Sequence, residues 1–272
     1  TKAYAGTFDG NGHTLSGIYI ATTTSNTGLI GYMGVDGRIK NLTMADSNIN
    51  ATGNYCGAFV GDSKGNIENC HTLSDVIVRG AGYVGGIVGE LDSDMSLVQC
   101  SNAGSVIGTA TYVGGIAGRV YSKSTTAVSK SFNTGDVKGK KWVGGISGCL
   151  YNGGTIVDSY NGGTIAADEI VGGLLGRMRT GSIENSYSAG EVKEIQKATK
   201  GAIIGDLDFA NGAKSLIKVF YKAGIAETIV GKLNSCTIQT GTAGSKTEEE
   251  LKNLAAELGE AFAKDDQNLN RG

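Results

Sequence analysis

Carboxylates are the first side chains in this sequence that could do chemistry. Glycoside hydrolysis uses two carboxyl groups that face each other across a groove. Outside one predicted helix, close carboxylate pairs occur at Asp92/Asp94 and at Asp265/Asp266. The first pair is expected in a loop between strands and the second beyond the helix end, which favours solvated turn residues. The sequence therefore predicts no catalytic residue, and we expect a protein that is not an enzyme.

The two histidines give no clearer signal of catalysis. Neither His13 nor His71 has a serine or cysteine nucleophile at a recognisable spacing, and neither has a partner pattern for a metal ion. No acidic loop of the kind that binds calcium is present either. We therefore predict no metal and no cofactor, and we interpret His71 as a stacking side chain.

Aromatic residues recur in two sets at intervals of about one repeat. The first set is Tyr55, Tyr83, Tyr112 and Trp142, and the second is Phe132, Tyr160, Tyr187 and Tyr221. An outward set would place rings about 4.8 Å apart in a strip that could stack on sugars or seat a protein. An inward set would be core, and the Gly-Gly that follows the first set leaves its direction open. The predicted ligand-binding residues are Tyr83, Tyr112 and Trp142, with a glycan or a host extracellular protein as partner.

Five cysteines are an odd number, so they cannot all pair within the chain. Cys70 and Cys100 share a column of the repeat in which serine stands elsewhere, at Ser131, Ser159 and Ser186. A disulfide between adjacent coils is geometrically allowed. The serines favour free thiols in a ladder of small residues, and Cys56 is interpreted as a small hydrophobic residue.

The elements that would position these side chains are set by an internal repeat. An apolar block rich in glycine, with VGGIVG as its clearest form, ends at glycines 31, 61, 89, 118, 148, 176, 205 and 231. Successive differences are 30, 28, 29, 30, 28, 29 and 26, which gives a period near 29 residues. A second block, such as IENSYSAGEV from Ile183, follows each copy in the middle of the chain. This is the pattern of a repeat protein.

Short β-branched segments bounded by Gly, Asn, Asp and Ser predict strands. About 29 residues suit a coil of three strands and three turns, and stacked coils would form parallel sheets around a filled interior. The absence of proline agrees, whereas a propeller needs about 40–45 residues per blade. We predict an all-β fold, a parallel β-helix (β-solenoid) of about eight coils, with Ile87, Ile116 and Ile146 stacked inside. Glycines 104, 135, 163, 190 and 224 are expected to have left-handed backbone at a turn.

The two ends of the chain differ from its middle. Residues 1–20 are predicted to form an incomplete first coil of a solenoid that spans residues 1–245. Residues 246–272 are predicted to form a C-terminal capping helix and tail, because Thr247 to Glu250 match a capping box. Apolar residues then follow at helical spacing, at Leu251, Leu254, Ala255, Leu258 and Phe262. The helix would cover the terminal coil or dock a partner.

The blocks FDGNGHTLSGI, VGGIVG and NSYSAGEV resemble the GLUG repeat, a module of large secreted and wall-anchored bacterial proteins. Some IgA-specific peptidases carry it outside their catalytic domain. The resemblance covers residues 4–272 and implies a right-handed parallel solenoid, an extracellular or cell-surface location, and further domains in a longer parent chain. It implies no reaction. The string Arg38-Ile39-Lys40 is similar to one in polygalacturonases, but the companion motifs of that family are absent, and Ile39 fits the apolar column of Ile67 and Leu97.

Composition and charge exclude several classes of partner. The net charge is −2 without a basic block, so we expect no nucleic-acid partner. There is no long apolar run, so we expect no membrane insertion. The leading hypothesis is a non-catalytic structural or adhesive module that acts as a rigid spacer or a weak multivalent binder. The alternatives are a polysaccharide-active β-helix enzyme, either lyase or hydrolase, and an accessory domain of a secreted peptidase.

Overall fold

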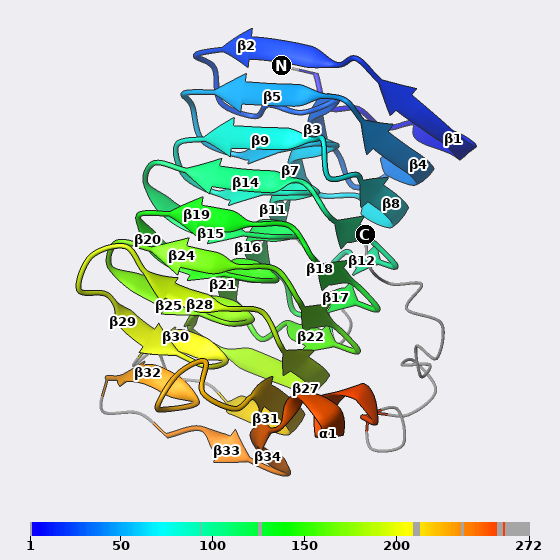
Figure 1. Cartoon of the computed structure of the whole chain (residues 1–272). Coiled ribbons are helices and arrows are strands. Elements are labelled where there is room, and N and C mark those ends of the chain that lie inside the picture. Colours follow the sequence, from blue (N-terminus) through cyan, green and yellow to red (C-terminus); the bar gives the residue numbers. More distant parts are fainter. Residues whose placement is uncertain are drawn as a thin grey trace.

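The computed structural model describes residues 2–92, 94–124, 127–208, 213–234, 237–254 and 258. They form an all-β parallel β-solenoid of about eight turns, with about 29 residues per turn and almost no helix (Figure 1). The predicted fold class is confirmed.

Each middle coil has four sides, whereas a coil with three strands was predicted. Each side belongs to one of four parallel sheets, called A to D, and the chain passes through them in the order C, D, A, B. The reason lies in the glycine-rich block, which turns a corner at its Gly-Gly and so supplies two strands. Sheet D contains β6 (Cys56–Gly57), β10 (Val84–Gly85), β15 (Thr111–Gly114), β20 (Lys141–Gly144), β25 (Ile170–Gly172) and β29 (Thr199–Gly201). Sheet A contains β3 (Ile30–Met33), β7 (Val60–Ser63), β11 (Val88–Asp92), β16 (Ala117–Tyr121), β21 (Ser147–Tyr151), β26 (Leu175–Met178), β30 (Ile204–Leu207) and β32 (Val230–Leu233).

The other two sheets form the remaining sides. Sheet C contains β2 (Tyr19–Thr22), β5 (Asn48–Ala51), β9 (Ile77–Gly80), β14 (Ser105–Gly108), β19 (Val137–Gly139), β24 (Ile165–Ala167) and β28 (Val192–Glu194). Sheet B begins with β1 (Thr7–Ser16), β4 (Arg38–Ala45), β8 (Asn66–Thr72), β12 (Leu97–Val98), β13 (Ser101–Asn102), β17 (Val128–Ser129) and β18 (Phe132–Asn133). It continues with β22 (Thr155–Val157), β23 (Tyr160–Asn161), β27 (Gly181–Ser188), β31 (Lys214–Lys222), β33 (Gln239–Thr240) and β34 (Ala243–Lys246).

The core consists of apolar columns that run along the solenoid axis. Ile87, Ile116 and Ile146 are fully buried, and each donates or accepts a backbone hydrogen bond of 3.0 Å to the next. The predicted isoleucine stack is therefore confirmed. Because every coil repeats the same cross-section, one apolar residue per repeat fills the same position in each coil.

The glycines after the second block were expected to have left-handed backbone, and this expectation is wrong for all but Gly224, whose φ is 84°. At Gly104 a Cβ would lie 2.5 Å from the carbonyl oxygen of Val76 in the preceding coil. At Gly135 it would collide with the carbonyl oxygen of Gly104. The coils approach too closely here for any side chain, so glycine is required by space and not by φ.

Buried polar residues form two further ladders inside sheet B. The side-chain amides of Asn102, Asn133 and Asn161 are fully buried, and each donates to the next over 2.8 and 2.9 Å. In the neighbouring column, the hydroxyl of Ser159 accepts a 3.3 Å hydrogen bond from the N–H of Ser131, and Ser186 does the same for Ser159 over 3.1 Å. These bonds satisfy polar groups that would otherwise be costly to bury, and they tie each coil to the next.

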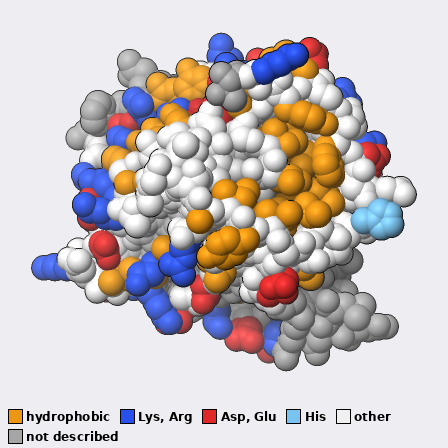
Figure 2. Space-filling model, turned by 90° about the horizontal axis from the view of Figure 1, so that it is seen from above, with side chains coloured by type: hydrophobic (Ala, Val, Ile, Leu, Met, Phe, Trp, Pro, Cys, Tyr) orange, Lys and Arg blue, Asp and Glu red, His pale blue; other side chains and the backbone are white. Residues whose placement is uncertain are grey.

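The N-terminal end face exposes more apolar surface than the middle of the solenoid. Residues 1–20 supply β1 and β2, which pair in parallel with β4 and β5. Hydrophobic side chains gather on this end (Figure 2). Ile18, Ile20 and Leu29 pack against the core and stay partly exposed.

The helix α1 (Glu248–Lys252) begins with the predicted capping box: Thr247 accepts from the Glu250 N–H, and the Glu250 side chain accepts from the Thr247 N–H. Beyond it, Leu254 and Leu258 pack on Phe220 and Tyr187. This segment therefore covers an outer face of sheet B beside the last coils, in addition to its contacts with β31 and β34. The predicted apolar positions at Ala255 and Phe262 lie outside the described residues. No helix among the described residues has the length and apolar character needed to cross a membrane.

Candidate functional site

The first aromatic ladder lies at the corner between sheets C and D. Tyr55, Tyr83, Tyr112 and Trp142 stack one above another, with ring centroids 4.7, 5.2 and 4.9 Å apart. All four are half-buried. The predicted alignment of the three ligand-binding candidates is thus present in the structure, while their binding role stays a prediction.

The direction of these rings follows from their backbone. Each of the four has a left-handed φ, between 54° and 62°, a region that costs a bulky residue about 1–2 kcal/mol. The next residue in each coil, such as Val84 or Val113, points into the core. The unusual φ turns the aromatic side chain outward and over sheet A, where Tyr83 and Trp142 contact arginines of β16 and β26.

Stacking limits what this ladder can offer a ligand. The two faces of an inner ring are occupied by the rings above and below, so only ring edges meet solvent. At one end of the ladder, the guanidinium of Arg177 lies 4.5 Å from the Trp142 ring centroid, and the Lys141 amine lies 4.8 Å from it. A flat strip of open faces, as expected from the spacing, is therefore not what the ladder presents.

Beside the ladder, the outer face of sheet A carries a row of ionisable residues that sequence analysis missed. Register places Asp62, Glu90, Arg119, Cys149, Arg177 and Asp206 on successive strands. Arg119 forms an ion pair with Glu90, and Arg177 lies 3.5 Å from Asp206 and 3.0 Å from Asp208. The Trp142 indole N–H donates to Asp206 over 3.0 Å. The signal in the sequence is an ionisable residue three positions after the isoleucine column, as at Glu90 after Ile87 and Arg119 after Ile116.

The aromatic rings and arginines shield this ionic row from water. Glu90, Asp206 and Asp208 are at most 5% exposed. Burial raises the pKa of Glu90 above its ordinary value, against the opposing effect of Arg119, and burial also raises the pKa of Asp62. Burial raises the pKa of the Cys149 thiol to about 12, so it stays protonated. The row consists largely of paired charges and not of free catalytic groups.

His71 occupies the predicted column, below Ser101 and Phe132. The structure also places the Ser101 hydroxyl 2.8 Å from His71 Nδ1, a neighbour one coil away that spacing did not reveal. His71 Nε2 lies 2.9 Å from Asn69 Oδ1, so Nε2 carries the proton and Nδ1 accepts from Ser101. The Asn69 amide donates in turn to Asn41 Oδ1. Ser101, His71 and Asn69 therefore each donate a hydrogen bond to the next residue, and we assign this hydrogen-bond network a structural role. The other histidine, His13, lies in β1.

The remaining candidates have structural positions. Asp92 was predicted in a loop, but it is the last residue of β11, and its carboxylate lies 3.5 Å from the Lys64 amine. Asp94 accepts a hydrogen bond from the Lys123 N–H. Ile39 is buried and in register with Ile67. Asp265 and Asp266 lie outside the described residues.

The described cysteines are buried free thiols, at Cys56, Cys70, Cys100 and Cys149. Cys70 and Cys100 donate to the carbonyl oxygens two residues earlier, as the serines of their column do. Cys56 is in register with Val84, as expected of a small hydrophobic residue. Among the described residues, no cluster of three or more His, Cys, Asp or Glu could hold a metal ion.

The second aromatic ladder departs from prediction at its last member. Phe132, Tyr160 and Tyr187 stack with centroids 4.9 and 5.0 Å apart and with ring planes 4° and 2° apart. Register then places Phe220, and not Tyr221, in the column, since Tyr221 pairs with Ser188. The copy of the second block that contains Gly224 is degenerate, so counting back from that glycine gave a position one residue too late.

Comparison with known proteins agrees with the fold. The chain matches no protein-family model, so the resemblance to the GLUG repeat stays a prediction. A stretch of 94 residues, 34% of this chain, is 38% identical to halomucin from Haloquadratum walsbyi and spans only 1% of halomucin. The crystal structure of a candidate immunoglobulin A1 protease from Bacteroides ovatus is similar with a TM-score of 0.56 and 21% identity, over 93% of this chain and 72% of that chain. This likeness shows a shared β-solenoid fold.

Proposed function

We propose that this chain is a non-catalytic structural and adhesive module of an extracellular or cell-surface bacterial protein. It would act as a stiff spacer that presents neighbouring domains and would bind weakly along its sides. The observation that supports this most directly is the continuity of ladders: through the middle coils, apolar, amide, hydroxyl and aromatic columns run from coil to coil in register. The local similarity to halomucin and the fold shared with a candidate immunoglobulin A1 protease support the location.

Stiffness can be measured between spin labels on one row of sheet C. Ala21, Asn50 and Lys193 are exposed and belong to a single register row that ends six strands after Ala21. At about 4.8 Å per strand, the pair Ala21→Cys/Lys193→Cys should be separated by roughly 29 Å at the backbone. The control pair Asn50→Cys/Lys193→Cys should be shorter by about one strand spacing.

Both distance distributions should be narrow for a stiff spacer. Broad distributions, or a difference that does not match one strand spacing, would reject it.

The adhesive role predicted for Tyr83, Tyr112 and Trp142 is limited by geometry to contacts with ring edges. An array of glycans and host extracellular proteins, probed with the native chain and Trp142→Ala, tests that role.

A second candidate is the polysaccharide-active enzyme, for which Asp62 and Glu90 provide a specific observation. They are register partners on neighbouring strands, and a retaining glycosidase needs carboxyl groups about 5–5.5 Å apart. Burial raises the pKa of both, and Glu90 Oε2 is buried without a hydrogen-bond partner among the described residues. Against this, Glu90 is only 5% exposed and is paired with Arg119.

The enzyme candidate is tested with uronic-acid and neutral glycans as substrates. We expect no turnover by the native chain. Turnover that Glu90→Gln or Asp62→Asn abolishes would establish the enzyme and overturn the non-catalytic proposal. The third possibility, an accessory domain of a secreted peptidase, agrees with the shared fold and depends on the domains of the parent chain.

A further inference from the structure

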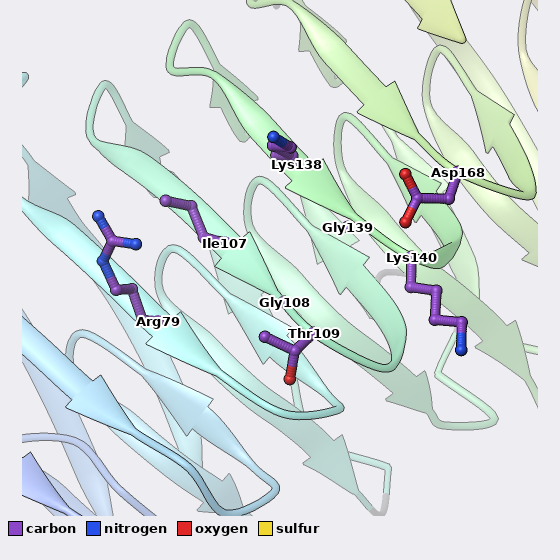
Figure 3. Close-up of a pocket in the computed structure, with 8 residues that line it drawn as sticks. All are labelled: Arg79, Ile107, Gly108, Thr109, Lys138, Gly139, Lys140 and Asp168. Carbon is purple, nitrogen blue, oxygen red and sulfur yellow. The ribbon is translucent and has the colours of Figure 1, made fainter. Parts of the chain in front are cut away.

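A groove of about 390 Å³ lies on the outer side of sheet C and extends to the turns that lead into sheet D (Figure 3). Arg79 of β9, Lys138 of β19 and Lys140 just after β19 supply three cations to it, and Asp168 supplies one carboxylate. The three cations are solvent-exposed. None of the sequence motifs pointed to this groove, because its residues come from four different coils.

These three cations differ from neighbouring lysines in the ion pairs that they form. Lys141 pairs with Glu169 at 2.8 Å, and Lys193 pairs with Glu191 at 2.8 Å. In the part of the chain that the structure describes, Arg79, Lys138 and Lys140 form no ion pair. On a chain whose net charge is −2, three cations and one carboxylate give this groove a local excess of positive charge that attracts an anion.

The spacing of the cations follows from strand register. Arg79 pairs with Ile107, and Ile107 pairs with Lys138, so the two cations lie two strands apart, roughly 10 Å. The half-buried Ile107 lies between them, and Gly108 and Gly139 leave the floor beside it without side chains. This is an apolar patch between two charges, on which the C–H face of a sugar ring can pack.

Asp168 narrows the class of ligand further. A carboxylate among three cations repels a simple polyanion, but it accepts hydrogen bonds from hydroxyl groups, as the Thr109 hydroxyl also does. An acidic peptide strand would instead need free backbone partners. The strands β9, β14 and β19 already pair with each other, so they offer no edge. A ligand that carries both carboxylates and hydroxyls fits best.

We propose that this groove binds a linear acidic polysaccharide with one carboxylate per disaccharide. Its carboxylates would pair with Arg79 and with the Lys138/Lys140 pair, and its hydroxyls would donate to Asp168. The inference rests on the adhesive part of the proposed function and gives that part a site and a ligand class. It is independent of the stiffness of the solenoid.

The test measures binding of the full chain to hyaluronan, which has one carboxylate per disaccharide, at low ionic strength. The double variant K138Q/K140Q should bind about tenfold more weakly, since two exposed charge contacts are lost. The matched control K123Q/K232Q removes the same charge from exposed lysines outside the groove and should bind as the native chain does. Binding should fall as salt rises.

Asp168→Ala separates recognition from simple charge attraction. Loss of a hydroxyl acceptor should weaken hyaluronan binding, whereas a groove that only attracts anions would bind more tightly once the negative charge is gone. Tighter binding, equal losses in the two double variants, no binding at low salt, or a preference for polyglutamate, single-stranded DNA or a sulfated glycan without carboxylates would each overturn the proposal. Narrow spin-label distances in the same samples would show that the spacer proposal survives such a failure.

Discussion

The two aromatic ladders have the same spacing and opposite surroundings. In the first, each aromatic residue has a left-handed backbone, the rings are up to 38° from parallel, and Trp142 is held by Arg177 and Asp206. In the second, the rings are 2–4° from parallel and the end of the ladder is covered by Leu254 and Leu258. The first ladder ends on Arg177 and Lys141, whereas the second ends under an apolar segment, with the Lys246 amine 5.0 Å from the Phe220 ring centroid.

This difference shows that the parallel stacking of coils sets the spacing between rings, while the neighbouring sheet or segment decides which residues contact the rings. Rings that project from a corner lie over the ionic row of sheet A and shield it. Rings that project from sheet B stack on each other, and the C-terminal segment covers Tyr187 and Phe220. The ladders therefore stabilise different parts of the molecule.

The largest effect should come from Arg177→Ala, because it removes the cation that joins the first ladder to two buried carboxylates. Asp206 and Asp208 are 3% and 2% exposed, and breaking a buried ion pair costs about 3–5 kcal/mol. We expect the free energy of unfolding to fall by about 4 kcal/mol in urea titrations. Arg179→Ala is the control: its side chain is 37% exposed and pairs with Asp208 at 2.7 Å, whereas Arg177 contacts both Asp206 and Asp208, so an equal loss at Arg179 would refute a special role for Arg177.

Trp142→Ala should come next, at about 3 kcal/mol, because it opens a gap at the end of the stack. Trp142→Phe keeps a ring on Tyr112 but loses the indole hydrogen bond to Asp206, which is worth about 1.5–3 kcal/mol with a charged acceptor. Both are measured by urea unfolding. If the phenylalanine variant is as unstable as the alanine variant, the hydrogen bond and not the stack holds this end.

In the second ladder, Leu254→Ala should cost about 2 kcal/mol. Burial raises the pKa of Tyr187 well above its ordinary value, and loosening the segment that covers it should bring this pKa back toward 10. Ultraviolet titration of tyrosine ionisation in the native chain and the variant measures the change. An unchanged titration would mean that Tyr160 and Phe220, and not the C-terminal segment, keep water from Tyr187.

The smallest effect should be a pH dependence of opposite sign at the two ladders. Burial lowers the pKa of His71 below 6.5, so its contribution to stability is present above that pH and is lost as pH falls through the folded-state pKa. Burial raises the pKa of Glu90 above 4.5, so its contribution is present at lower pH and is lost as pH rises through the folded-state pKa. Urea titrations of His71→Asn and Glu90→Gln from acid to neutral pH should each remove one of these trends. Identical curves for both variants would contradict this assignment.

Several features could be predicted because a parallel stack puts residues one repeat apart in direct contact. The period of about 29 residues was enough to identify the isoleucine column, the shared column of Cys70 and Ser131, and the alignment of Tyr83 above Tyr112. The capping box at Thr247 was also legible, since it depends only on neighbours in the chain. Where the last repeat degenerates, the same reasoning placed Tyr221 where Phe220 lies.

The shape of the coil and the partners across its corners were decided by the tertiary structure. A repeat period fixes which residues stack, but it does not fix how many corners a coil has or which way a residue at a corner points. The left-handed φ of Tyr83 and its equivalents brings the first ladder over sheet A and onto Arg119 and Arg177. The groove cations Arg79 and Lys138, in contrast, lie in one register row along the stack, so the repeat period places them two strands apart. Contacts along the stack follow from the sequence period, whereas contacts around the coil depend on backbone angles that only the folded chain defines.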